Sequence, residues 1–117
     1  MFQLDFLSMA DNYKDRKIAN DTINEVMIDT VEVNDNYEFP YETGVCSKFY
    51  NNNKWVIVEQ YQTKEQAEIG HSKWLKQFTN KDKMPQTLKD VSTCGVAQLR
   101  NIFAKEKDLT FEKTNDY

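Results

Sequence analysis

The sequence predicts an α+β fold, in which a small antiparallel β-sheet of three to four strands packs against a capped amphipathic helix and is followed by C-terminal helices. Two observations carry this prediction. Segments rich in β-branched and aromatic residues alternate with turn-forming residues in the first half of the chain. A segment with apolar residues at helical spacing follows them directly. The length of 117 residues is typical of one domain, so we expect one core.

The segment from Glu25 to Val33 is open to two interpretations. Its apolar residues fit a helical stripe, with acidic residues on the opposite side. Its density of Val, Ile and Thr favours a strand instead, because β-branched side chains lose rotational freedom in a helix. We therefore favour a strand, paired with an earlier strand near Arg16–Ile23.

A β-hairpin is predicted further along the chain. The segments Gly44–Tyr50 and Trp55–Tyr61 both have the composition of strands. The sequence Asn-Asn-Asn-Lys at 51–54 separates them, and asparagine tolerates the left-handed backbone that such a turn needs.

A helix is predicted from Thr63 to Asn80. Thr63 and Gln66 match a capping box, in which two side chains satisfy free amides of the first turn. One apolar stripe follows at helical spacing, formed by Ala67, His71, Trp74, Leu75 and Phe78. The polar stretch before Pro85 predicts the end of this helix.

The C-terminal part predicts a short helix over Gln86–Val91 and a longer one over Gly95–Lys105. The longer helix would carry an apolar stripe of Val96, Leu99, Ile102 and Phe103. The polar tail from Lys107 is expected to be loose, with Leu109 and Phe111 as isolated anchors. The domain organisation is therefore an extension over 1–8, with Met9 as an original start, one domain over 9–105 and a flexible tail over 106–117.

Composition sets several classes of function aside. The formal net charge of −4 disfavours generic binding to nucleic-acid phosphates. No apolar run is long enough to span a membrane, and the N-terminus lacks the basic region of a secretory signal. Cys46 and Cys94 stand far apart without a CxxC pattern, which favours a reducing compartment, although a single disulfide between them stays possible.

His71 is the only histidine, so sites that need two histidines are excluded. Its place on the apolar stripe favours a buried ring bonded to a backbone carbonyl over a ligand or acid–base role. A cysteine nucleophile paired with His71 is disfavoured, since a free cysteine is commonly a small buried residue. The three glycines form no phosphate-binding loop: Gly70 fits close helix packing, and Gly44 fits a strand start or bulge.

The strongest positive feature is an acidic segment without any lysine or arginine. Carboxylates without neighbouring bases disfavour metal-dependent or glycosidase catalysis. The segment is either a face that contacts a basic partner or a solubilising surface, and the sequence leaves both open. The candidate partner-binding residues are Asp21, Glu25, Asp29, Glu32, Asp35, Glu38 and Glu42.

Lysines near aromatic residues do not predict nucleic-acid binding here. Trp74 and Phe78 fall on the core stripe of the predicted helix, whereas stacking on bases requires exposed rings. The lysines concerned are Lys73, Lys76, Lys81 and Lys83.

Several blocks of sequence resemble a family of small proteins encoded by tailed bacteriophages. The blocks are MADNYKDRKIA (9–19), TVEV, YETGV, KWVIVEQYQTKEQAEIGHSKW (54–74) and LKDVSTCGVAQL (88–99). The resemblance covers 9–103 and is most specific at Ala67, Gly70 and His71. It implies a phage origin and a product that acts in the host bacterial cytoplasm or in the virion, and it carries over no catalytic residue.

We therefore expect a non-enzymatic phage accessory protein, without a cofactor, that binds a host protein such as a defence or nucleic-acid enzyme. The alternatives are a minor structural or assembly protein of the virion and a protein that binds a nucleotide signal. The expected partner is a host or phage protein, with a homo-oligomer possible, and neither nucleic acid nor membrane is expected.

Overall fold

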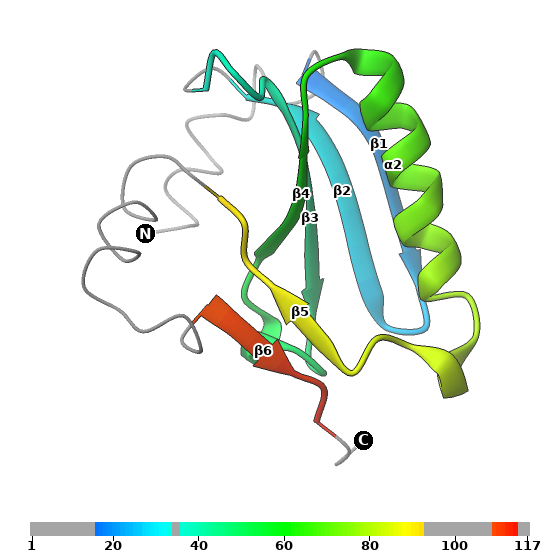
Figure 1. Cartoon of the computed structure of the whole chain (residues 1–117). Coiled ribbons are helices and arrows are strands. Elements are labelled where there is room, and N and C mark those ends of the chain that lie inside the picture. Colours follow the sequence, from blue (N-terminus) through cyan, green and yellow to red (C-terminus); the bar gives the residue numbers. More distant parts are fainter. Residues whose placement is uncertain (1–15, 34–35, 93–108, 115–117) are drawn as a thin grey trace.

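The main sheet has four antiparallel strands in the order β1-β2-β3-β4, in a computed structural model that describes residues 16–33, 36–92 and 109–114. The strands are β1 (Lys17–Ile23), β2 (Val26–Glu32), β3 (Tyr41–Ser47) and β4 (Val56–Tyr61). One helix, α2 (Lys64–Gln77), covers one face of this sheet (Figure 1). A second sheet of two strands pairs β5 (Thr87–Lys89) with β6 (Thr110–Glu112). The predicted α+β class, with a sheet against a capped helix, is confirmed.

The first hairpin confirms that β2 is a strand rather than a helix. Its side chains alternate, so that Val26, Ile28 and Thr30 are buried toward α2. The two-residue turn places Asn24 and Glu25 at φ 51° and 65°, which is the left-handed backbone of a tight hairpin. The side-chain amide of Asn24 donates to the backbone carbonyls of Phe78 and Thr79 at 2.8 and 3.0 Å, so this turn is tied to the end of α2.

The second hairpin is also confirmed, and its turn works as predicted. Asn51, Asn52 and Asn53 have φ values of 48°, 52° and 64° and form the short 3-10 helix η1 (Asn51–Asn53). The strand before the turn spans Tyr41–Ser47, so it begins and ends three residues earlier than expected. The register of β3 against β4 shifts between Thr43 and Gly44, where Val58 is the extra residue of β4. The bulge therefore lies in the strand opposite Gly44, and Gly44 itself is inside β3 rather than at its start.

The start of α2 is close to the prediction. Thr63 caps the helix by accepting a hydrogen bond from the Gln66 amide at 3.1 Å. The Gln66 side chain accepts from the Gln62 amide at 3.0 Å, one residue before the position that a capping box uses. The helix ends at Gln77, three residues early, because Asn80 caps the next turn, η2 (Lys81–Lys83), through the Asp82 amide.

The predicted short helix over Gln86–Val91 is wrong, because β5 forms there and pairs Leu88 with Phe111 of β6. A strand of three residues carries almost no local pattern, and its partner lies more than twenty residues away. The structure also differs from the expected loose tail at 109–114, since β6 forms there and Leu109 is buried. The predicted extension over 1–8 and the predicted helix over Gly95–Lys105 lie outside the described residues.

The core lies between the sheet, α2 and the β5–β6 pair. Tyr50 meets Phe78 edge to face at 6.0 Å between ring centroids and donates its hydroxyl to the Pro85 carbonyl at 2.6 Å. Burial raises the pKa of Tyr50 to about 12. The buried cluster consists of Val26, Ile28, Val45, Phe49, Tyr50, Val56, Val58, Phe78, Met84 and Leu88.

Candidate functional site

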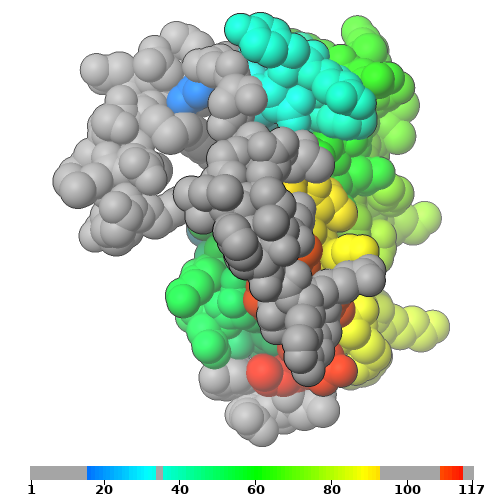
Figure 2. Space-filling view, turned by 60° about the vertical axis from the view of Figure 1, so that its left-hand side comes forward, coloured from blue at the N-terminus to red at the C-terminus, as the bar shows by residue number. Residues whose placement is uncertain are grey.

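The loop between β2 and β3 presents an exposed aromatic side chain. The side-chain oxygen of Asn36 accepts from the amides of Glu38 and Phe39 at 3.0 and 2.8 Å, which fixes the turn around Tyr37. The Val33 amide donates to the Pro40 carbonyl at 2.7 Å across the base of the loop. Tyr37 is 100% exposed. We call Asn36, Tyr37 and Glu38 the Tyr37 tip, and Figure 2 shows this part of the chain, in cyan, at the upper edge of the molecule.

The structure separates the acidic residues that the sequence grouped together. Glu32 and Glu38 are exposed on the side of the β2–β3 loop. Glu25 lies in the β1–β2 turn, at the opposite end of the sheet (Figure 1), and pairs with Lys48 at 2.8 Å. The hydrogen bond from Lys48 holds the pKa of Glu25 below its ordinary value.

The remaining acids lie on different faces of the sheet. Asp21 faces α2, whereas Asp29 lies on the opposite face, where it accepts from Asn20 at 2.9 Å. The β2–β3 register puts Glu42 on the same face as Asp29. Asp35 is outside the described residues. The acidic segment is therefore divided over both faces and both ends of the sheet.

A chain of polar side chains runs through the interface between α2 and the sheet. The His71 ring is 4% exposed, and its Nε2 and Nδ1 atoms lie 2.7 Å from the Asp21 carboxylate and 2.7 Å from the Thr30 hydroxyl. Thr30 contacts the Thr43 hydroxyl at 2.5 Å, and Thr43 contacts the Tyr61 hydroxyl at 2.9 Å. All four strands of the main sheet and the helix contribute a side chain to this row.

At the other end of this row of side chains, opposite Asp21, lies a second carboxylate, that of Glu59. Tyr61 donates to Glu59 Oε1 at 3.2 Å, and the Trp74 indole donates to the same oxygen at 2.8 Å. Burial alone would raise the pKa of Glu59, but the hydrogen bonds from Lys73 and Trp74 outweigh it and hold this pKa below its ordinary value. Burial also raises the pKa of Tyr61, so the phenol keeps its proton. We call Asp21, His71, Thr30, Thr43, Tyr61 and Glu59 the His71 chain.

Asp21, His71 and Thr30 follow the acid, histidine, hydroxyl order of a hydrolytic triad. The hydroxyls, however, are not accessible to a substrate. A nucleophile must reach its substrate, and Thr30 and Thr43 are both 0% exposed. The Thr30 hydroxyl is also engaged by Thr43. In this conformation the groups therefore join the helix to the sheet.

The predicted burial of His71 is confirmed, and its predicted backbone partner is wrong. Its partners are the side chains of Thr30 and Asp21. The sequence could have indicated these two partners, because each is a polar residue at an inward-facing position of a strand, where apolar residues are usual. Tyr37 was missed because a fully exposed aromatic residue has no local pattern.

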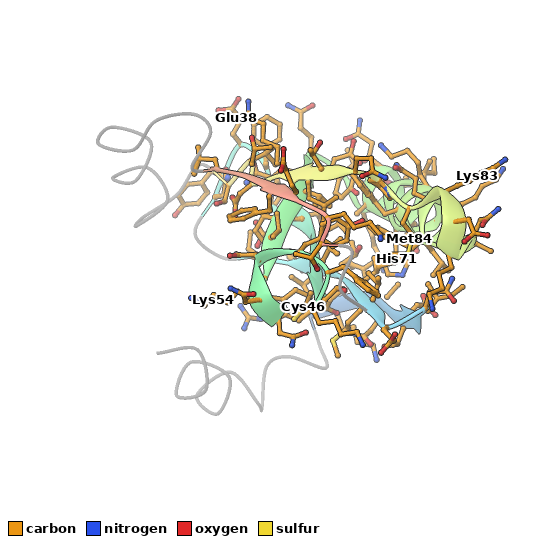
Figure 3. The ribbon with its side chains drawn as sticks, turned by 90° about the horizontal axis from the view of Figure 1, so that it is seen from below. Glu38, Cys46, Lys54, His71, Lys83 and Met84 are labelled. Carbon is orange, nitrogen blue, oxygen red and sulfur yellow. The ribbon has the colours of Figure 1, made fainter. Side chains whose placement is uncertain are left out.

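Cys46 and His71 lie on opposite faces of the sheet. The neighbours of Cys46 in β3, Val45 and Ser47, are buried toward α2, so Cys46 points the other way. Its thiol donates to the Asn53 carbonyl at 3.1 Å, and burial raises the pKa of the thiol. Figure 3 shows Glu38 and Cys46 at different sides of the molecule. Cys94 is outside the described residues.

Within the described residues, no three histidine, cysteine or acidic side chains gather closely enough to hold a metal ion. In the same part of the chain, no helix has the length and apolar character needed to cross a membrane. Comparison with models of protein families, with curated proteins and with solved structures finds no match for this chain. The fold and the sites therefore define an α+β protein with an exposed aromatic tip and a buried polar chain.

Proposed function

We propose that this protein acts by binding another protein through the Tyr37 tip. The observation that carries the proposal is the complete exposure of Tyr37 on a turn whose backbone is already held by hydrogen bonds. Tyrosine supplies a large contact area at a small cost in conformational entropy, which is why it is enriched in binding surfaces. A turn that is formed before binding lowers the ordering cost further.

The charge around the tip favours a basic partner. Glu38 lies within the tip, and Glu32 is exposed at the end of β2, where the chain enters the same loop. Carboxylates near an aromatic anchor steer a positively charged surface toward it and fix its orientation. The acidic residues on the other face and at the other end of the sheet are not part of this proposed surface.

The sequence resemblance to tailed-phage proteins supports a bacterial host protein as the partner. In this proposal the protein is a phage accessory protein that acts in the host cytoplasm by binding rather than by transforming a substrate. A host enzyme of defence or of nucleic-acid metabolism with a basic surface would fit the charge of the tip.

The test compares three forms of the full chain as baits in a bacterial host lysate: wild type, Tyr37→Ala and Ile69→Ala. Ile69 is a matched control because it is also a large exposed side chain, 71% exposed, but lies on α2. We expect a captured protein that wild type and Ile69→Ala retain and that Tyr37→Ala loses, with retention that weakens as salt is raised. Capture of the same proteins by all three forms, or of none by wild type, would reject the proposal.

A further inference from the structure

The His71 chain contains a fixed number of protons, and this number constrains the charge of the imidazole. Five contacts join its six groups in a row from Asp21 to Glu59. Each contact needs one hydrogen to be a hydrogen bond. Both ends are carboxylates, and an ionised carboxylate only accepts. All five hydrogens must therefore come from the groups between the two ends.

Three of these hydrogens come from hydroxyl groups, one each from Thr30, Thr43 and Tyr61. Glu59 sets their direction, because Tyr61 must donate to it. Tyr61 then accepts from Thr43, and Thr43 accepts from Thr30. Since the Thr30 hydroxyl has already used its hydrogen, it accepts from His71 Nδ1.

His71 must supply the other two hydrogens. Nδ1–H donates to Thr30, and Nε2–H donates to the Asp21 carboxylate. A neutral imidazole carries one N–H, so only the imidazolium satisfies both contacts. We propose that His71 is a buried imidazolium in the folded protein and that loss of one of its protons leaves one of the five contacts of the row without a hydrogen.

The charged groups around the ring agree with this assignment. Asp21 of β1 contacts the ring directly, and its side chain is 48% exposed. Glu59 of β4 acts through the hydroxyls, and Lys73 of α2 pairs with it at 2.7 Å. Glu68, one turn before His71 on α2, is exposed. From β2 and β3 the ring is faced by the neutral hydroxyls of Thr30 and Thr43, since Asp29 and Glu42 lie on the other face of the sheet.

A neutral His71 would leave one of the five contacts without a hydrogen, wherever the gap falls in the row. Two acceptors would then face each other, which is costly where the contact is closed to water, as it is at the buried hydroxyls of Thr30 and Thr43. The row connects α2 to all four strands of the main sheet. All five contacts of the row are hydrogen bonds only while both ring nitrogens of His71 carry a proton.

A residue that does not contact His71 is expected to change the protonation of its ring. Tyr61→Phe removes one hydrogen and two contacts, because the row then ends at Thr43. The three remaining contacts need three hydrogens, which the hydroxyls of Thr30 and Thr43 and a single N–H of His71 supply. A neutral ring then satisfies the shortened row. Tyr50→Phe is the matched control, since it removes another buried phenol hydroxyl that donates to Pro85 and takes no part in the row.

The measurement is a pH titration followed by ¹⁵N NMR of the imidazole, together with amide hydrogen exchange of α2. We expect both ring nitrogens of the wild type to carry protons at neutral pH. In Tyr61→Phe the midpoint for loss of one proton should fall by about one pH unit or more, which equals about 1.4 kcal/mol, and Tyr50→Phe should leave it unchanged. Exchange protection of α2 in the wild type should fall as His71 loses its proton.

Three results would each overturn the inference: a neutral single tautomer in the wild type at neutral pH, equal midpoints in the two tyrosine variants, or protection of α2 that ignores the titration. Thr43→Val is a second variant for the case in which Tyr61→Phe does not fold. It removes the middle hydroxyl at nearly constant volume and should lower the midpoint in the same direction.

Discussion

Gly70 of α2 lies directly against the phenol of Tyr61 in β4. A Cβ atom on residue 70 would stand 2.2 Å from the Tyr61 hydroxyl oxygen and 2.3 Å from two ring carbons. Both residues are buried, so the ring has no free space into which to move. The absence of a side chain at Gly70 therefore sets how closely the helix approaches the sheet, which confirms the role predicted for this glycine.

Gly70→Ala is expected to destabilise the protein although alanine favours helix. Replacing an interior helical glycine by alanine normally gains about 1 kcal/mol. Forcing an extra methyl group into a packed interface costs about 1–3 kcal/mol, and here the clash involves ring carbons as well as the hydroxyl. Urea unfolding should show a lower midpoint for Gly70→Ala. Ser72→Ala, at an exposed position of α2, is the control, and equal stability of the two variants would contradict the close approach.

The cap of α2 gives a second prediction. The Thr63 hydroxyl satisfies the Gln66 amide, which has no partner within the helix. Thr63→Ala should therefore lower the free energy of unfolding by about 1 kcal/mol, as measured by urea denaturation. Lys64→Ala, one residue later on the exposed side, should lower it by much less. A Thr63→Ala protein with unchanged unfolding would show that water replaces the cap at no cost.

The parts of the fold that sequence predicts well are those that local signals determine. Three successive asparagines need no distant partner to adopt the left-handed backbone conformation, so the β3–β4 turn can be predicted from the sequence. Thr63 likewise caps the helix that begins at the next residue, through an amide only three positions away. In both places the residues that define the structure are neighbours along the chain.

The parts that sequence predicts poorly depend on distant partners. β5 is a strand only because β6 pairs with it from more than twenty residues away. The partners of His71 come from strands that lie 41 and 50 residues earlier in the chain. The imidazole and its partners meet only when α2 packs on the sheet. The hydrogen-bonded row could therefore not be predicted from the sequence and was identified only in the folded structure.

Alkaline pH gives a third prediction, through Tyr50. An unfolded tyrosine has a pKa near 10.0, whereas burial raises the pKa of Tyr50 to about 12. The folded state therefore keeps a proton that the unfolded state releases. The stabilisation is complete below pH 10 and is lost as the pH rises toward about 12. In a series of urea unfolding curves Tyr50→Phe should make this decline less steep, and the part that remains comes from Tyr61, whose pKa burial also raises. Tyr37→Phe, at the fully exposed tip, should leave the decline as steep as in the wild type.

The last prediction concerns Leu109, which leads into β6. Its carbonyl accepts from the Asp90 amide at 2.8 Å, and its side chain is buried, so this part of the chain contributes to the folded core. Leu109→Ala should lower the free energy of unfolding by about 2 kcal/mol or more, because a buried leucine leaves a cavity when it is shortened. Glu112→Ala changes an exposed side chain of the same strand and should have little effect. If urea denaturation gives the same midpoint for both variants, β6 does not pack as the structure shows and the tail is loose after all.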